Sequence, residues 1–292
     1  MPDPLSPDAY RALVREALLE DVGPGDITTR AVVPETLRAD AIIQAKSACV
    51  VAGLDVVREV FRQIDTSVDV AAVKRDGDAC VVGDVIAHVK GPAAAVLTGE
   101  RTALNFLQHL SGIATATRAF VEAASGRLEN PDAASGRLRI LDTRKTIAGF
   151  RTLAKYAVTC GGGVNHRVGL YDGILIKDNH IRIAGGVEEA VRRARAIGSM
   201  LPIEVEAQRL TDVDAALVAG ADIIMLDNMD DAMTRAAIAK IAGRAKVELS
   251  GNMTMDRVRA LADSGADYIS IGAVTHSAPA ADISLEVERL LS

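Results

Sequence analysis

The second half of the chain repeats one pattern, in which a short apolar run is followed by a stretch with helical spacing. Six such runs occur: RILDT at 139–143, GILIK at 173–177, PIEVE at 202–206, DIIML at 222–226, KVELS at 246–250 and YISIG at 268–272. Four intervening stretches end in a glycine at the place of a helix C-cap: Gly198, Gly220, Gly243 and Gly265. Strands joined by such helices form a parallel sheet with right-handed crossovers. Because no Gly-x-Gly-x-x-Gly motif is present, the pattern favours an α/β barrel over an open dinucleotide-binding sheet.

The first third of the chain predicts helices combined with an antiparallel sheet. A helix over 10–20 ends at Gly23-Pro24-Gly25, and Asp26 then either caps a short helix or contacts a ligand. Further elements are expected as strands at 39–53, 68–74 and 85–90 and as helices at 54–63 and 94–124. Gly112 is expected to kink or divide the last of these helices.

Two domains are expected from this change of pattern. The first spans 1–115 and the barrel spans 116–276, with a polar loop at 125–136. The tail at 277–292 alternates as a strand would, which favours its return to the first domain, although a closing helix is the alternative.

Composition excludes several classes of protein. The net charge of −6 argues against nucleic-acid and membrane-surface partners, because both select basic faces. No apolar run is long enough to span a membrane, and no signal-peptide pattern opens the chain. Cys49, Cys80 and Cys160 fit neither a zinc pattern nor a disulfide framework, so we expect free thiols in a reducing cytoplasm.

Polar side chains are concentrated where the apolar runs end, and barrels gather their active sites at the carboxyl ends of strands. In chain order, the run ends carry Asp142, Thr143, Arg144 and Lys145; Lys177, Asp178 and Asn179; Glu206; Asp227 and Asn228; Ser250, Gly251 and Asn252; and Gly272 and Ala273. Upstream of Lys177, a glycine-rich stretch leads into Asn165, His166 and Arg167. The arginines suit bidentate binding of carboxylates. The two last run ends contain glycine and suit a phosphate held by backbone N–H groups.

The acidic residues allow two interpretations. Glu206 and Asp227, near strand ends, suit a sugar's hydroxyl groups or Mg²⁺. Glu204 and Glu248, deeper in their runs, either bind a ligand or form internal salt bridges with lysines and arginines of neighbouring strands. His166 is either a histidine satisfied beside a turn or part of the ligand site. Together these residues predict a site for a phosphorylated sugar and a carboxylated partner.

Longer motifs resemble the quinolinate phosphoribosyltransferase family. They are EDVGPGDITT, ERTALNFLQHLSGIATAT, LDTRKT, KYAVTCGGGVNHRVGLYDGILIKDNH, IMLDNM, ELSGNMT and SIGAVTH, and they span nearly the whole chain in order. The resemblance implies an N-terminal α/β sandwich domain, an incomplete barrel of six or seven strands, and a homodimer, with larger assemblies left open. It implies conversion of quinolinate and phosphoribosyl pyrophosphate (PRPP) into nicotinate mononucleotide, pyrophosphate and carbon dioxide, with Mg²⁺ and no organic cofactor.

The resemblance also implies roles for individual residues. Thr143, Arg144, Lys145, His166 and Arg167 would line the quinolinate pocket, and Lys145 is a catalytic candidate. Lys177, Glu206 and Asp227 would hold the Mg²⁺-bound PRPP and take part in catalysis, with Mg²⁺ contacted directly or through water. The 5′-phosphate would bind at Ser250, Gly251 and Asn252 and at Ile271, Gly272 and Ala273. Arg101, which the sequence alone would leave in a surface ion pair, would reach the partner subunit's site.

One departure and four alternatives remain. At 146–150 the chain has Ala148 where the family commonly has proline before the glycine, which should loosen this loop. The alternatives are a transferase that accepts nicotinate, a paralogue in molybdenum metabolism, a Schiff-base aldolase using Lys177, and a non-catalytic PRPP sensor.

Overall fold

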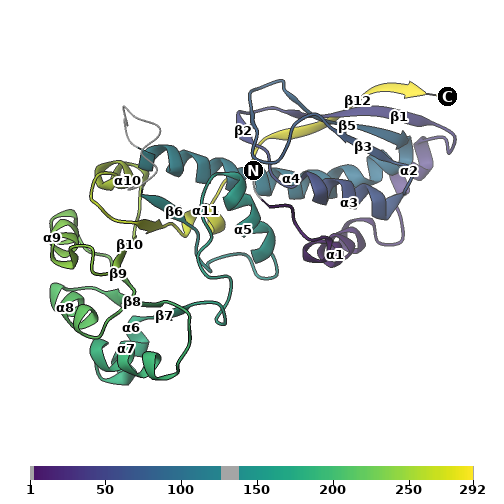
Figure 1. Ribbon diagram of the computed structural model, residues 1–292. Coiled ribbons are helices and arrows are strands. Elements are labelled where there is room, and N and C mark those ends of the chain that lie inside the picture. The colour runs from purple at the N-terminus through teal and green to yellow at the C-terminus, as the bar shows by residue number, and fades with distance from the viewer. Residues whose placement is uncertain (1–2, 126–137, 292) are drawn as a thin grey trace. The chain divides into compact units, whose positions relative to one another are not determined.

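The computed structural model describes residues 3–125 and 138–291, so most of the loop expected at 125–136 lies outside the described residues (Figure 1). The chain divides into two compact units. Unit 1 comprises Met1–Arg118, Thr146–Gly162 and Val274–Ser292, and unit 2 comprises Ala119–Lys145 and Gly163–Ala273. A single boundary at 115/116 stays a prediction, because the two units interleave along the chain.

Unit 1 is built on an antiparallel sheet in the order β12-β1-β5-β3 (Figure 1). Its strands are β1 (Arg38–Ala45), β3 (Asp69–Ala72), β5 (Val85–Pro92) and β12 (Ile283–Leu291), and β2 (Cys49–Val50) pairs separately with β4 (Ala79–Cys80). β12 pairs with β1 from Ala45↔Ile283 to Arg38↔Leu291. The tail is therefore a strand and not a closing helix.

The helices expected at 10–20, 54–63 and 94–124 are present with ends within two residues of those positions, whereas two further helices of unit 1, at 7–9 and 151–160, were not expected. The helices of unit 1 are η1 (Pro7–Ala9), α1 (Arg11–Val22), α2 (Ile27–Val32), α3 (Leu54–Ile64), α4 (Ala93–Ser125, whose last residues belong to unit 2) and α5 (Arg151–Cys160). Asp26 caps α2, because its Oδ1 accepts the Thr29 N–H at 2.9 Å. α1 stops at Gly23, whose φ is +50°.

Gly112 does not divide α4, which is one continuous helix. A Cβ on Gly112 would lie 2.0 Å from the carbonyl oxygen of Pro279. This glycine therefore allows the C-terminal segment to cross the helix closely, a long-range contact that helical periodicity does not contain.

Unit 2 contains a parallel sheet in the order β7-β8-β9-β10-β11-β6, and this confirms the expected incomplete barrel. The strands are β6 (Arg139–Leu141), β7 (Ile174–Ile176), β8 (Ile203–Ala207), β9 (Ile223–Asp227), β10 (Lys246–Ser250) and β11 (Tyr268–Ser270). The helices are α6 (Asp178–Ala184), α7 (Val187–Ala196), α8 (Leu210–Val218), α9 (Asp231–Ile241) and α10 (Met255–Leu261), and α11 (Ala273–His276) begins at the unit's last residue. β6 and β7 form the two edges, although Val164 makes a parallel bridge to Leu141 beside β6.

The two faces of this sheet differ in chemistry, and the difference positions the site. Val205 of β8 and Ile224 and Leu226 of β9 share one face of the sheet and are fully or almost fully buried. The alternate positions of β8, Glu204 and Glu206, point the other way, toward the barrel interior. None of the described helices is long and apolar enough to cross a membrane.

Candidate active site

A cavity of about 140 Å³ lies at the carboxyl ends of the strands in unit 2. It is lined by Asp142, Thr143, Arg144, Lys145, His166, Arg167, Leu175, Lys177, Met225, Glu248, Ser250 and Ser270. We call it the strand-end pocket. Seven of the sequence-predicted site residues therefore meet here: Thr143, Arg144, Lys145, His166, Arg167, Lys177 and Ser250.

The turn at 165–167 carries two of the cationic groups and is fixed by local hydrogen bonds. Fully buried Asp142 accepts the backbone N–H of His166 at 2.9 Å. The backbone N–H of Arg167 donates to the Nδ1 of His166 at 2.7 Å. The guanidinium of Arg167 donates to the carbonyl of Gly173 at 3.1 Å, while its Nε is buried and has no hydrogen-bond partner within the described part of the chain.

Arg167 lies in an unfavourable electrostatic setting. Burial lowers the pKa of its guanidinium, and the charge of Arg144 lowers it further. Two guanidinium groups are thus held close enough to repel each other in a partly dehydrated pocket. An anionic ligand would relieve both effects.

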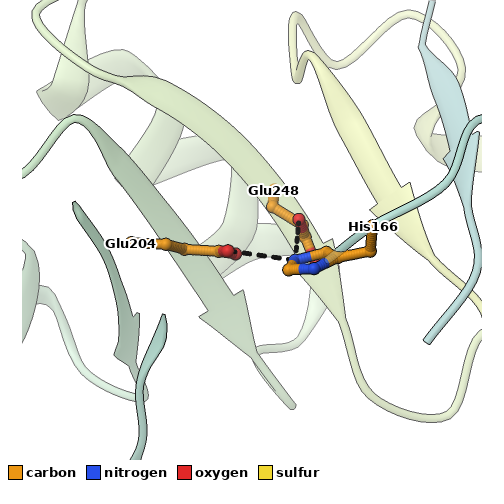
Figure 2. Close-up of side chains that lie close together, drawn as sticks. All are labelled: His166, Glu204 and Glu248. Carbon is orange, nitrogen blue, oxygen red and sulfur yellow. Dashed lines mark ion pairs between the residues drawn. The ribbon is translucent and has the colours of Figure 1, made fainter. Parts of the chain in front are cut away.

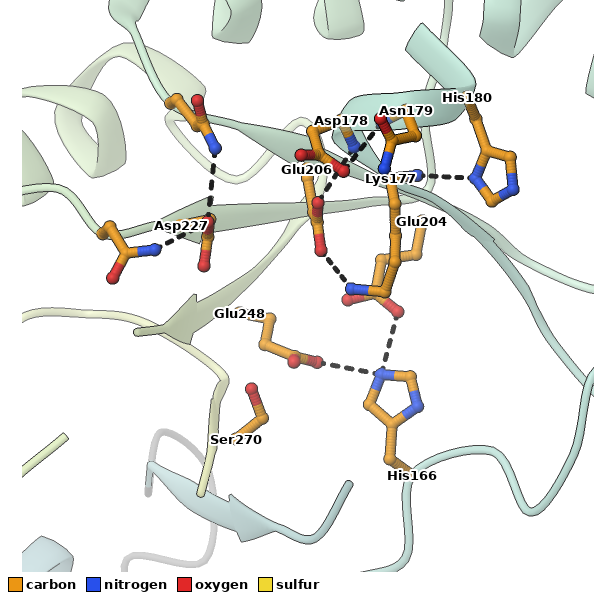
Figure 3. Close-up of polar contacts among 12 residues, drawn as sticks. His166, Lys177, Asp178, Asn179, His180, Glu204, Glu206, Asp227, Glu248 and Ser270 are labelled. Atoms are coloured by element: carbon orange, nitrogen blue, oxygen red, sulfur yellow. Dashed lines mark hydrogen bonds and ion pairs between the residues drawn. The ribbon is translucent and has the colours of Figure 1, made fainter. Parts of the chain in front are cut away.

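Lys177 and Glu206 link the ends of β7 and β8 (Figure 3). The Nζ of Lys177 donates to the Oε1 of Glu206, and the Oε2 of Glu206 accepts the Asp178 N–H at 3.1 Å. Asp178 is the first residue of α6, so Glu206 also lies at the positive end of that helix. Both carboxylate oxygens of Glu206 are therefore engaged.

Asp227 ends β9 and lies beside Asn228 (Figure 3). Its Oδ2 accepts hydrogen bonds from the Asn228 side chain at 2.8 Å and from the Gln208 side chain at 3.4 Å. Asn228 has a φ of +56°, which asparagine tolerates better than most residues. Asp227 is outside the lining of the strand-end pocket, at the neighbouring strand end.

The barrel interior below the pocket contains a cluster that the sequence interpretation missed. The Nε2 of His166 lies 3.0 Å from Glu204 and 3.4 Å from Glu248 (Figure 2). The lysine and arginine partners expected for these glutamates are thus replaced by a histidine. Strand pairing explains this, because Glu248 is level with Met225 and Glu204 with Ile223, which leaves an apolar strand between the two carboxylates.

Two influences on His166 oppose each other. Burial lowers the pKa of His166, whereas hydrogen bonds with Glu204 and Glu248 raise it, with a net value of about 10. The Arg167 N–H, however, donates to Nδ1, and a proton on that nitrogen would face it directly. Because Nδ1 of His166 accepts this hydrogen bond, we assign the neutral imidazole with its hydrogen on Nε2. Burial raises the pKa of Glu204 to about 7, and the hydrogen bond to His166 opposes this shift.

The late strand ends have the expected glycine geometry. Gly251 has a φ of +91°, and a Cβ there would lie 2.2 Å from the Oδ1 of Asn228. Asn252 follows with a φ of +47°. After β11, the Ile271 N–H donates to the carbonyl of Leu141 at 2.9 Å, and Gly272 leads into α11. Residues 250–252 and 271–273 thus follow the neighbouring strands β10 and β11.

Arg101 belongs to unit 1, where it is exposed on α4. No ion pair among the described residues involves Arg101, so the surface salt bridge that the sequence alone favoured is absent from that part of the chain. Asp142 and Ser270 were not chosen as site residues, although both line the strand-end pocket. Ser270 ends β11 on the same face as Tyr268, so the period of two was the available signal for it, whereas Asp142 was marked only by its place directly after β6.

One group of side chains among the described residues has the donor atoms and the spacing of a metal site. His166, Glu204 and Glu248 form a set of three whose ligand atoms all lie within 4.8 Å of one another. Glu206 and Asp227 are not part of such a set, and Glu206 is engaged with Lys177 and the Asp178 N–H. These two residues therefore do not form a preformed binding cage for a resident metal ion.

Known proteins resemble both units. Residues 26–111 match the family model described as "Quinolinate phosphoribosyl transferase, N-terminal domain", and residues 113–286 match that of the C-terminal domain. A probable nicotinate-nucleotide pyrophosphorylase (carboxylating) of Bacillus subtilis is 43% identical over 95% of this chain and 93% of its own length. The crystal structure of NadC from Streptococcus pyogenes is 40% identical over 99% of each chain, with a TM-score of 0.91. The nicotinate-nucleotide pyrophosphorylase structure from Francisella tularensis is 38% identical over 98% of each chain, with a TM-score of 0.89. The chain therefore belongs to the quinolinate phosphoribosyltransferase family.

Proposed function

We propose that this protein transfers the phosphoribosyl group of PRPP to quinolinate with loss of carbon dioxide. The products are nicotinate mononucleotide and pyrophosphate, and the reaction serves the synthesis of NAD. The observation that carries this proposal, given the family, is the convergence of Arg144, Lys145, Arg167 and Lys177 on one small pocket at the strand ends. A protein with a net charge of −6 holds such a cationic group together only where an anion is to be bound.

Quinolinate is placed in the strand-end pocket by its two carboxylates. Arg144 and Arg167 supply planar donors that match carboxylates, and the buried Nε of Arg167 has a hydrogen to offer. Lys145 and Thr143 lie on the same loop after β6, where the Lys145 N–H donates to the Thr143 hydroxyl at 3.0 Å. His166 lines the pocket with both ring nitrogens engaged by the protein, which favours a supporting role over direct binding.

PRPP is placed beside quinolinate, toward β8 and β9. Lys177 is close enough to the pocket to pair with the pyrophosphate, and Glu206 holds the lysine in that position. Asp227 keeps Oδ1 available for a ribose hydroxyl or for Mg²⁺, since its hydrogen bonds among the described residues go to Oδ2. Because the carboxylates form no preformed cage, we propose that Mg²⁺ enters as part of the Mg²⁺–PRPP substrate, with Glu206 acting through water at most.

The 5′-phosphate is assigned to the loops after β10 and β11. Within 250–252 and 271–273, the backbone at Gly251 and Gly272 can approach a phosphate closely because these residues carry no side chain, whereas the Ile271 N–H already donates to the carbonyl of Leu141. The hydroxyl of Ser250 lines the strand-end pocket and can orient the phosphate end of the sugar.

The reaction then follows from these positions. When the bond between C1 of the ribose and pyrophosphate breaks, positive charge develops at C1, and Glu206 and Asp227 stabilise it. Lys177 stabilises the departing pyrophosphate. The ring nitrogen of quinolinate, held opposite the leaving group, forms the new bond to C1 and becomes cationic. The adjacent carboxylate can then leave as carbon dioxide, because the positive charge on the ring nitrogen stabilises the electron pair that stays on the neighbouring ring carbon. That carbon takes up a proton from solvent to give nicotinate mononucleotide.

A homodimer completes the proposal. Arg101 is exposed and free of ion pairs among the described residues, so its guanidinium can serve a site on a second copy of the chain. We further place the protein in a reducing compartment, the cytoplasm, because its three cysteines are free and buried.

Two other reactions fit these contacts less well. A transferase for nicotinate would need one cationic partner fewer, because nicotinate has one carboxylate. A Schiff-base aldolase would need the Nζ of Lys177 to attack a carbonyl, whereas this nitrogen is engaged with the carboxylate of Glu206.

Product analysis tests the assignment. The purified protein with Mg²⁺ and PRPP should release pyrophosphate and carbon dioxide on addition of quinolinate, and neither on addition of nicotinate. Pyrophosphate release with nicotinate, or none with quinolinate, would overturn it.

A further inference from the structure

The cluster of His166, Glu204 and Glu248 lies inside the barrel (Figures 2 and 3), and two of its members, His166 and Glu248, also line the strand-end pocket. The side chains of Glu204 and Glu248 are only 5% and 1% exposed. Each keeps one buried oxygen, Oε1, that has no hydrogen-bond partner among the residues that the structure describes. Two nearly buried carboxylates facing one imidazole are costly, so their presence requires an explanation.

A metal ion is the first explanation to consider, and the tautomer of His166 argues against it. A metal would bind the lone pair of Nε2, and the ring would then carry its hydrogen on Nδ1. That hydrogen would point at the backbone N–H of Arg167, which already donates to Nδ1 at 2.7 Å. With the ring in the observed orientation, Nε2 is the donor and the glutamates are the acceptors.

The hydrogen bonds through His166 connect three strands to one turn. Asp142, just after β6, accepts a hydrogen bond from the backbone N–H of His166. Glu204 of β8 and Glu248 of β10 face the Nε2 of the His166 ring. Nδ1 then fixes the peptide that leads into Arg167. The direction of the Arg167 side chain therefore depends on carboxylates that lie on the far side of the barrel.

We propose that Glu204 and Glu248 are positioning residues that hold His166 through Nε2 and thereby set the placement of Arg167 in the quinolinate pocket. The inference rests on the proposed function for the identity of the ligand, but not for the geometry. Neither glutamate needs to touch the substrate. Their negative charge has a second effect, since it opposes the binding of an anion in the pocket above.

These two effects can be separated by substitution. Glu204→Gln and Glu248→Gln remove the charge but keep an oxygen that accepts from Nε2. Glu204→Leu and Glu248→Leu remove both the charge and the accepting oxygen of the substituted residue. Apolar side chains of similar size are often tolerated in place of buried ionic groups. We expect the leucine variants to weaken quinolinate binding about tenfold, since a hydrogen bond to a charged group is lost. Each glutamine variant should bind quinolinate at least about tenfold more tightly than the leucine variant at the same position, because its side-chain oxygen still accepts from Nε2.

Calorimetric titration with quinolinate measures the affinity of each of the four variants. Titration with Mg²⁺–PRPP is the internal control. The affinity for PRPP should not change in any of the four variants. Glu288→Leu, at an exposed position of β12, is the matched control for the change from glutamate to leucine. Leucine variants that bind quinolinate as the unaltered protein does would overturn the proposal, as would equal losses for both substrates.

The tautomer is tested independently by NMR of protein labelled with ¹⁵N in its five histidines, with His166→Gln for assignment. A hydrogen on Nε2 supports the proposal, and one on Nδ1 overturns it. Stoichiometric binding of Zn²⁺ or Mn²⁺ that is lost in Glu204→Leu would replace the positioning role with a metal site. If the unaltered protein binds no quinolinate, the proposed function fails, and the tautomer still decides whether the cluster is built as described.

Discussion

Lys177 and Glu206 form an ion pair between the carboxyl ends of β7 and β8, two neighbouring strands of the barrel. The lysine is the more exposed partner, at 46% against 9% for the glutamate. The carboxylate of Glu206 is fixed by its place on β8 and by the hydrogen bond from the Asp178 N–H. It in turn holds the flexible side chain of Lys177 in place. Such an arrangement prepares a cation for a ligand at little further cost in side-chain entropy.

Lys177→Met should reduce kcat by at least about a hundredfold, because preorganised charge at a leaving group has effects of that size. The substitution keeps an unbranched side chain that is one atom shorter, and it removes the charge together with the N–H donors. Lys246→Met is the matched control, since Lys246 also pairs with a carboxylate, that of Asp267, but at the opposite ends of the strands. Steady-state release of pyrophosphate measures both. Similar rates for the two variants would contradict the role given to Lys177.

Arg167→Ala should raise the KM for quinolinate by about tenfold or more, because a charge-assisted hydrogen bond is lost. Arg167→Lys should recover only part of the loss, since lysine cannot donate from two nitrogens. The fold should remain intact, because removing Arg167 relieves its repulsion with Arg144. Arg193→Ala, in an exposed ion pair of α7, is the control. An unchanged KM in Arg167→Ala would remove this residue from the pocket.

The sequence was sufficient for the strands and for most polar residues at their ends. Period-two runs followed by charged residues predicted β6 to β11, and the positive φ angles of Gly198, Gly220, Gly243 and Gly265 agree with the four expected helix ends. These features are local, because they depend on residues within one turn or one strand. Positions such as Lys177 and Arg144 could therefore be selected before any contact was known.

Features that depend on pairing between distant segments could not be predicted in this way. The partner of Glu204 and Glu248 is His166 because of the order and register of the strands, and no spacing in the chain encodes that. Gly112 similarly reflects a crossing segment 167 residues further along the chain, at Pro279, and not a break in its own helix. The pairing of β12 with β1 is the third case of this kind.

Ala148→Pro should stabilise the protein by about 0.4 to 1 kcal/mol. The Phe150 N–H donates to the carbonyl of Ile147 at 3.1 Å, and Gly149 has a φ of +77°. This is the geometry of a type II turn, in which proline suits the position that Ala148 occupies. Urea unfolding measures the change, and Gly149→Ala should destabilise because alanine resists a positive φ. A destabilised Ala148→Pro variant would show that the turn is not of this type.

The three cysteines should be unreactive in the folded protein. All three thiols are buried, and burial raises the pKa of Cys160 to about 12, with the charge of Asp76 adding to the effect. Burial likewise raises the pKa of Cys49 to about 11. A thiol reagent at pH 8 should therefore label the native chain slowly and label three groups after unfolding. Fast labelling of one thiol that abolishes activity would reopen the possibility of a cysteine nucleophile.

Mixing two inactive chains tests whether Arg101 serves the partner subunit. If it does, a heterodimer of an Arg101→Ala chain and a Lys177→Ala chain has one site with both substitutions and one with neither. After random exchange of equal amounts, about a quarter of all sites should be intact. The control mixes Lys177→Ala with Glu206→Gln, two residues of the same site in the same chain, which should leave every heterodimer site with one defect. Activity that returns only in the first mixture supports the shared site. If neither mixture recovers, Arg101 acts within its own chain or outside the site.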